Sequence, residues 1–207
     1  MDTPLSGISG LNWAKARDMK VIAFMNFKGG SGKTTLTCLS ALYLAAAKSA
    51  RVRIRDLDRG GDAEAFTRHI QDPAIQLFQP EESQDAYDYL LIDTPGGIHE
   101  KEMRSIAQIA HRIVIPFALS PTDIRRSRQT VEALQGCPQA KVLLNQVNAQ
   151  TNAYKQREAL VAKVGIPALS NFLSKRVAYS YALAGGSSQL TTECIRELAL
   201  VVEEMIA

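Results

Sequence analysis

The chain has 207 residues, 46% hydrophobic and 22% charged, which suits one globular domain with a substantial core and argues against a disordered or collagen-like chain. Its apolar runs stop short of the roughly 18 residues that a membrane span requires, and its N-terminus lacks the apolar segment of a signal peptide, so we expect a cytoplasmic protein. The three cysteines are too far apart for a disulfide framework or a C-x-x-C metal pair, and the net charge of +3 permits contact with nucleic acid without establishing it.

Residues 1–18 show neither helical nor strand periodicity. Because disorder concentrates at chain ends, we interpret them as an N-terminal extension that is either disordered or foreign to the native protein. The domain itself is predicted to comprise residues 19–207.

A glycine-rich loop at 27–35 follows the apolar strand predicted over 21–25 and opens the Ala/Leu-rich helix predicted over 34–47. In this order, successive backbone N–H groups and the positive end of the helix surround a phosphate. The usual G-x-x-x-x-G-K-[ST] pattern requires a glycine five residues before Gly32, where this chain has Phe27. We therefore interpret the loop as a variant phosphate-binding loop, in preference to a glycine-rich turn with solvated lysines.

Two later strands end in carboxylates. Asp56 and Asp58 close the strand predicted over 52–58, and Asp93 closes the buried strand predicted over 89–93. Ligands of open α/β sheets bind at the carboxyl ends of the strands, where these acids are placed. Aspartates beside glycines also occur in ordinary turns, which is the alternative interpretation at both positions. Because the acids follow the glycine loop in order, we favour a Walker-B-type role for Asp93, which would hold Mg²⁺ through a water molecule.

The remaining segments alternate between strand-like and helix-like patterns. This alternation predicts a single doubly wound α/β domain, with a mostly parallel sheet and helices on both faces. The other predicted elements are strands at 75–78, 112–117, 141–145 and 168–172 and helices at 62–70, 100–110, 120–134, 152–164, 175–185 and 188–206.

Two groups of basic residues stand out near helix starts. Arg125, Arg126 and Arg128 lie early in the helix predicted over 120–134, where cations oppose the helix dipole. Lys175 and Arg176 begin a later helix. Both groups are candidates for phosphate contacts with nonspecific DNA, and the first group also for contact with a partner subunit's nucleotide; a solvated helix face is the alternative.

The segment from Lys28 to Thr35, K-G-G-x-G-K-T-T, closely resembles the deviant phosphate-binding loop of the ParA/MinD family of dimeric ATPases, and its eight residues match without a gap. The resemblance extends over residues 19–207 and implies ATP and Mg²⁺ as cofactors. It implies nucleotide contacts by Lys28, Gly29, Gly30, Ser31, Gly32, Lys33, Thr34, Thr35 and Asn145, the last as a reader of the adenine edge.

The same resemblance implies the roles of individual side chains. Lys33 would contact the β and γ phosphates, Lys28 would reach the nucleotide of a partner subunit, and Asp58 would orient the attacking water. The catalytic residues implied are Lys28, Lys33 and Asp58, and the magnesium-binding residues are Thr34, Asp56 and Asp93. The family commonly continues D-P-Q-G after the second aspartate, but this chain has Arg59-Gly60-Gly61, which leaves the contacts of this segment open.

The short chain, without a preceding helix-turn-helix domain, resembles the small ParA proteins that partition plasmids or position other cargo. This implies a cytoplasmic, nucleoid-associated homodimer that closes over ATP, binds DNA nonspecifically and hydrolyses ATP weakly until a ParB-like or ParG-like partner, a centromere-binding protein or cargo adaptor, stimulates it. The final helix is acidic, so binding to an anionic membrane in the manner of MinD is not expected.

Alternatives on the same fold remain open. A small-molecule kinase or synthetase would need no Lys28 and would act on a defined acceptor substrate. A nucleotide-binding module with little hydrolysis is the second alternative, because the altered residues at 59–61 could slow turnover. A metal-cluster carrier would need a cysteine pair, and the sequence offers none.

Overall fold

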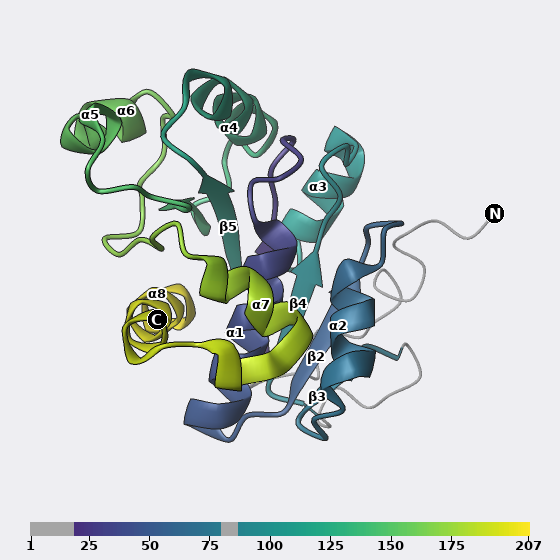
Figure 1. Ribbon diagram of the computed structural model, residues 1–207. Coiled ribbons are helices and arrows are strands. Elements are labelled where there is room, and N and C mark those ends of the chain that lie inside the picture. Colours follow the sequence, from purple (N-terminus) through teal and green to yellow (C-terminus); the bar gives the residue numbers. More distant parts are fainter. Residues whose placement is uncertain (1–18, 80–86) are drawn as a thin grey trace.

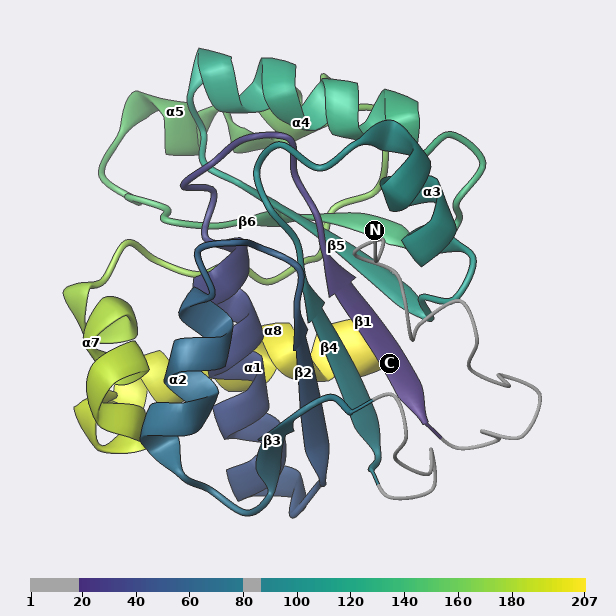
Figure 2. The same cartoon turned by 90° about the vertical axis from the view of Figure 1, so that its right-hand side faces the viewer.

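The computed structural model describes residues 19–79 and 87–207, so the predicted extension 1–18 lies outside the described residues. One sheet of six parallel strands runs through the domain (Figure 1), and their order, β3-β2-β4-β1-β5-β6, can be followed in Figure 2. The predicted fold class is confirmed, and every strand pair is parallel. The strands are β1 Lys20–Phe24, β2 Val52–Asp56, β3 Ile75–Leu77, β4 Tyr89–Asp93, β5 Arg112–Phe117 and β6 Ala140–Leu144.

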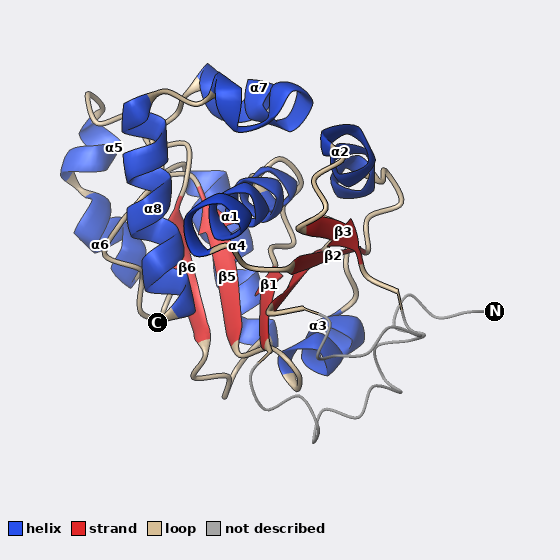
Figure 3. Cartoon of the chain, turned by 90° about the horizontal axis from the view of Figure 1, so that it is seen from below, coloured by secondary structure: helices blue, strands red, loops and turns tan. Residues whose placement is uncertain are grey.

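Helices cover both faces of the sheet (Figures 2 and 3). On one face α1, α2, α7 and α8 share a core with the sheet, and on the other α3 and α4 do so, with α5 and α6 packed at their side. None of the helices formed by the described residues is long and apolar enough to span a bilayer. The helices are α1 Lys33–Lys48, α2 Asp62–Ile70, α3 Glu100–Ala107, α4 Pro121–Ala133, α5 Asn152–Lys155, α6 Arg157–Ala162, α7 Val177–Gly185 and α8 Thr192–Ile206.

Strand β1, at the centre of the sheet, contains a continuous apolar run because both of its faces are buried. Ile22 and Phe24 contribute to the core beneath α1, whereas Val21, Ala23 and Met25 contribute to the core beneath α3 and α4. Successive side chains of a strand point to opposite faces, and a parallel sheet covered on both faces buries both sets. The continuous apolar run is therefore the expected signature of this central strand.

Local capping fixes the ends of the helices that flank the site. Gly32, with φ of 92°, precedes α1, and Ser49 ends it in the left-handed region with its N–H bonded to the Leu44 carbonyl. Ser120 caps α4 by accepting a hydrogen bond from the Asp123 N–H. The glycine before α1 leaves the first turn of that helix without a side-chain cap, so its N–H groups face the loop.

Two predicted elements are wrong in detail. The helix expected over 152–164 is broken at Gln156 into α5 and α6; neither piece has a fully buried residue, and Tyr154 and Val161 pack partly buried against the core. The strand expected over 168–172 forms an isolated bridge to β6, between Ala168 and Val142, and a second bridge joins Ser174 to Val147 beyond the end of β6. Between these bridges the N–H groups of Ser170 and Asn171 donate to Glu204 of α8 instead of to a neighbouring strand.

Strand register gathers the predicted functional segments at one edge of the sheet. Asp93 of β4 is paired with Phe24 of β1 on one side and with Asp56 of β2 on the other. The loop after β1, the two aspartates at the end of β2 and Asp93 therefore leave the sheet together. This carboxyl edge is where open α/β sheets bind ligands.

Candidate nucleotide-binding site

The glycine loop adopts a conformation that only glycine accommodates easily. Gly30 and Gly32 have φ of 74° and 92°, in the left-handed region. A Cβ on Gly32 would lie 2.2 Å from the Asn145 Nδ2 atom, which donates a hydrogen bond to the Ser31 carbonyl at 2.8 Å. The loop is thus closed by an amide from the end of β6 that occupies the space of a missing side chain.

Lys33 is folded back into the loop. Its Nζ atom donates to the Lys28 carbonyl oxygen at 3.1 Å, and its side chain is buried. Burial lowers the pKa of Lys33, while the charges of Asp93 and Asp58 oppose that shift. The Lys33 ammonium group therefore faces the space enclosed by the glycine loop, where a phosphate-binding lysine is required.

The residues around Asp93 fit a magnesium ion. The Thr34 hydroxyl donates to Asp93 Oδ2 at 2.6 Å, and among the described residues the buried Asp93 Oδ1 and Ser31 Oγ atoms have no hydrogen-bond partner. Burial raises the pKa of Asp93 to about 7, so the carboxylate gains from a nearby cation. The described residues contain no cluster of three metal-ligating side chains. Mg²⁺ would be held here by the Asp93 carboxylate, the Thr34 hydroxyl and phosphate oxygens.

Asp56 is engaged by backbone groups at the start of α2. Its oxygens accept from the N–H groups of Asp58, Ala63 and Glu64 at 2.9, 2.9 and 3.0 Å. Burial raises the pKa of Asp56, and these backbone hydrogen bonds oppose the shift. The carboxylate therefore organises the segment that carries Asp58, and its predicted place in the magnesium shell stays a prediction.

The turn after β4 presses directly on the glycine loop. A Cβ on Gly96 would lie 2.8 Å from both the N and Cα atoms of Gly29, so only glycine lets the two backbones approach so closely. The Thr94 hydroxyl anchors the turn by donating to the Phe24 carbonyl at 2.7 Å. Any movement of the loop around Gly29 must therefore move this turn as well.

Lys28 lies in an unforeseen place. Its Nζ atom is 2.5 Å from Asp123 Oδ1 of α4, in the same chain. The predicted contact with a partner subunit's nucleotide thus has a competitor inside the protomer. Sequence reasoning missed Asp123 because its spacing in α4 reads as part of an ordinary helix cap.

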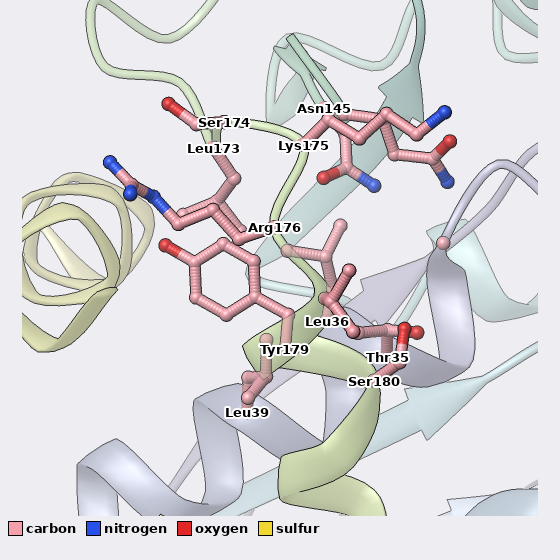
Figure 4. Close-up of a pocket in the computed structure, with 13 residues that line it drawn as sticks. Thr35, Leu36, Leu39, Asn145, Leu173, Ser174, Lys175, Arg176, Tyr179 and Ser180 are labelled. Atoms are coloured by element: carbon pink, nitrogen blue, oxygen red, sulfur yellow. The ribbon is translucent and has the colours of Figure 1, made fainter. Parts of the chain in front are cut away.

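A cavity of about 410 Å³ adjoins the loop and is of a size that suits a nucleoside (Figure 4). Leu36 and Leu39 of α1 and the ring of Tyr179 from α7 supply apolar walls, and Thr35 and Asn145 supply polar groups. Asn145 thus lies where an adenine reader is expected, although in this structure its amide also holds the loop. Within the wall formed by residues 173–180, the sequence drew attention to Lys175 and Arg176 as candidate DNA contacts, and nothing in it placed this segment beside the cavity.

The two basic groups are separated in space. Lys175 is exposed at the mouth of the cavity, whereas Arg176 turns toward α8 (Figure 4) and forms an ion pair with Glu197 at 2.6 Å. The segment containing them leads into α7, which packs on the opposite face of the sheet from α4. Three exposed arginines lie on α4, namely Arg125, Arg126 and Arg128.

Comparison of the sequence with known proteins agrees with this geometry. The family described as the CobQ/CobB/MinD/ParA nucleotide binding domain matches residues 22–189, a range that includes the glycine loop and both acidic strand ends. The protein named maintenance of carboxysome distribution protein A from Gloeobacter kilaueensis is 27% identical over 185 residues, which cover 83% of this chain and 84% of that protein.

Solved structures share the fold. An ATP complex of McdA from Cyanothece aligns with a TM-score of 0.73 and 16% identity, covering 91% of this chain and 96% of that one. The MinD protein of Pyrococcus horikoshii, complexed with Mg-ADP, aligns with a TM-score of 0.65 and 15% identity, covering 90% and 95%. At these identities the likeness establishes the architecture, in which those two proteins hold nucleotide.

Proposed function

The chain belongs to the CobQ/CobB/MinD/ParA family of nucleotide-binding domains, whose ParA and MinD members are ATPases, and we propose that it is a ParA-type partition ATPase acting with ATP and Mg²⁺. One observation carries the proposal. The glycine loop with its buried Lys33, the Thr34–Asp93 pair and the Asp58 segment meet at the same edge of one parallel sheet. Each is expected in an enzyme that holds and cleaves a triphosphate.

In this proposal the chain's own groups position and stabilise charge. Lys33 and the loop N–H groups hold the phosphates, and Asp58 positions the attacking water. The Thr34 hydroxyl and Asp93 hold Mg²⁺, which supplies charge neutralisation when bound. Asp56 keeps the Asp58 segment in place through its three backbone hydrogen bonds. Hydrolysis then depends on placement and electrostatics, with no covalent intermediate on the protein.

The assembly proposed is a homodimer that closes over two ATP molecules, with Lys28 reaching the partner's nucleotide. The closed dimer holds nonspecific DNA through basic residues, and a ParB-like or ParG-like partner that carries the cargo stimulates hydrolysis and release. The name of the Gloeobacter relative supports positioning of a cargo other than DNA as a variant of the same cycle.

ATP turnover tests the enzymatic part. Replacing Asp58 by Ala is expected to lower turnover about 100-fold while nucleotide binding persists, because the side chain acts on water and not on the loop. Asp62→Ala is the matched control, since Asp62 is an exposed aspartate at the start of α2. Equal turnover in wild type and Asp58→Ala contradicts this role, and turnover that requires an acceptor substrate favours a kinase or synthetase.

DNA binding tests the partition part. A mobility shift with nonspecific duplex DNA is expected with ATP and not with ADP or without nucleotide, because only the closed dimer sums the basic surfaces of two copies. Binding that ignores the nucleotide contradicts the proposed cycle.

A further inference from the structure

The lysine that opens the phosphate loop is held by a buried acid of its own chain. The Lys28 side chain is 31% exposed, whereas the Asp123 side chain paired with it is only 3% exposed. The second Asp123 oxygen accepts from the Ser120 hydroxyl. In the proposed function the same lysine contacts a partner subunit's nucleotide, so the Lys28 ammonium group has two alternative anionic partners.

Neighbouring contacts bind the loop backbone to the same helix. The Asn26 Nδ2 atom donates to Ser127 Oγ at 3.0 Å, and the Phe27 N–H donates to Thr130 Oγ1 at 3.0 Å. With Asp123, these α4 residues form a buried polar face at spacings of four and three. A buried polar face requires partners, and the loop supplies them. The start of the loop and α4 therefore form one hydrogen-bonded unit.

Asp123 is placed to survive the departure of Lys28. Removing one member of a buried ion pair is usually costly because it leaves an uncompensated charge. Asp123 lies in the first turn of α4, where the helix dipole favours an anion, and the Ser120 hydroxyl still donates to it. The ion pair can therefore open without leaving the carboxylate unsupported.

We propose that Asp123 is a counter-ion that retains Lys28 in the isolated protomer and competes for it with the nucleotide phosphates of the partner subunit. This inference rests on the proposed dimeric function. The attraction of one carboxylate for Lys28 is exceeded only when a partner subunit with bound triphosphate presents several negatively charged oxygens to the same lysine. Asp123 is thus a positioning residue that sets the nucleotide concentration at which two copies close.

The test is a titration of dimerisation with Mg²⁺ and the nonhydrolysable analogue AMPPNP, followed by sedimentation velocity. Asp123→Asn is expected to reach half-maximal dimer at about three- to tenfold lower AMPPNP, because each dimer must open two such ion pairs. The affinity of the protomer for ADP is expected to stay unchanged, which a merely structural role would not allow. Glu132→Gln removes the same charge from an exposed position of α4 and is expected to leave both quantities unchanged.

The outcomes separate the two proposals. If wild type binds AMPPNP and remains a monomer, the proposed dimeric function fails. If wild type dimerises and Asp123→Asn does so at the same or a higher concentration, the counter-ion role is overturned and the proposed function stands.

Ser120→Ala provides a second variant in case Asp123→Asn does not fold. It removes the hydroxyl that supports the carboxylate after Lys28 leaves, so the half-maximal AMPPNP concentration is expected to rise while ADP affinity is kept. An unchanged or lowered concentration in this variant overturns the inference.

Discussion

The phosphate loop is shaped by places where a side chain is absent. The Asn145 amide occupies the position that a Cβ on Gly32 would take, and the backbone at Gly29 occupies the position that a Cβ on Gly96 would take. The two glycines thus serve close packing, in addition to backbone freedom. The loop is consequently held on two sides, by the end of β6 and by the turn after β4.

Gly96→Ala is expected to weaken nucleotide binding at least about tenfold and to lower the free energy of unfolding by about 1–3 kcal/mol, because the new methyl group must displace backbone atoms. Gly97→Ala is the matched control, since a Cβ there meets nothing within 4 Å. Calorimetric titration with ADP and chemical denaturation measure both effects. Similar behaviour of the two variants contradicts the contact.

At the scale of elements, α8 secures the wall of the nucleotide cavity. Glu197 accepts from the Ser174 N–H at 3.1 Å and the Ser174 hydroxyl at 2.9 Å and pairs with Arg176, and Glu204 accepts from the N–H of Ser170 at 2.7 Å. The acidic face of α8 is therefore a set of hydrogen-bond acceptors for the segment before α7. The negative charges of Glu197 and Glu204 thus hold this segment of the same chain.

Glu197→Gln is expected to lower nucleotide affinity about threefold and the free energy of unfolding by about 1 kcal/mol, because it removes the charge that pairs with Arg176 and orders the wall. Glu193→Gln removes a second partner of Arg176 whose side chain is 70% exposed, and is expected to change neither. Thermal unfolding and ADP titration distinguish the two. Equal effects of both substitutions speak against the wall being held by Glu197.

The ion pair between Glu197 and Arg176 predicts a pH dependence of the stability of the fold. Burial tends to raise the pKa of Glu197, but the hydrogen bonds from Arg176, Ser174 and Tyr179 outweigh it and leave the pKa below its ordinary value of 4.5. A carboxylate whose pKa is lower in the folded state than in the unfolded state stabilises the fold at every pH above its unfolded-state pKa. This stabilisation is lost as the pH falls through the folded-state pKa. The stability difference between wild type and Glu197→Gln is expected to be constant above pH 4.5 and to shrink below it. A difference that persists unchanged in acid contradicts this assignment.

Much of the fold was predictable because its signals are local. Short apolar runs indicated the strands, two of which end in aspartate, and the loop from Lys28 to Thr35 indicated the site. The polar face of α4 was not predictable, because helical periodicity assigns residues such as Ser127 and Thr130 to solvent and does not reveal what packs against them. For the same reason the sequence showed that the last helix is acidic but not that a nonlocal backbone segment bonds to Glu197 and Glu204.

At the scale of the whole molecule, the candidate DNA contacts do not form one patch. The α4 arginines lie on a helix that packs on one face of the sheet, whereas Lys175 lies in the segment that leads into α7, which packs on the other face. Arg176 is occupied by α8 and is a weaker candidate than it was from sequence alone. The surface of α4 is therefore the stronger proposal for contact with DNA.

Replacing Arg125, Arg126 and Arg128 together by Ala is expected to weaken ATP-dependent DNA binding. The slope of log affinity against log salt should become shallower by about 0.9 for each DNA phosphate that the variant no longer neutralises, because counterion release scales with the charges neutralised. Lys175→Ala is the comparison on the other face. An unchanged salt slope in the triple variant, with AMPPNP dimerisation intact, removes α4 from the DNA surface.

One wall of the nucleotide cavity, residues 173–180, and α8, which secures it, come long after the glycine loop and Asp93 in the chain. On a translating ribosome, which adds about 5–20 residues per second, the complete phosphate loop therefore emerges several seconds before the residues that complete the nucleotide cavity. In the proposed dimer, a nascent chain that still lacks residues 173–206 has no complete nucleotide cavity and is not expected to pair through nucleotide.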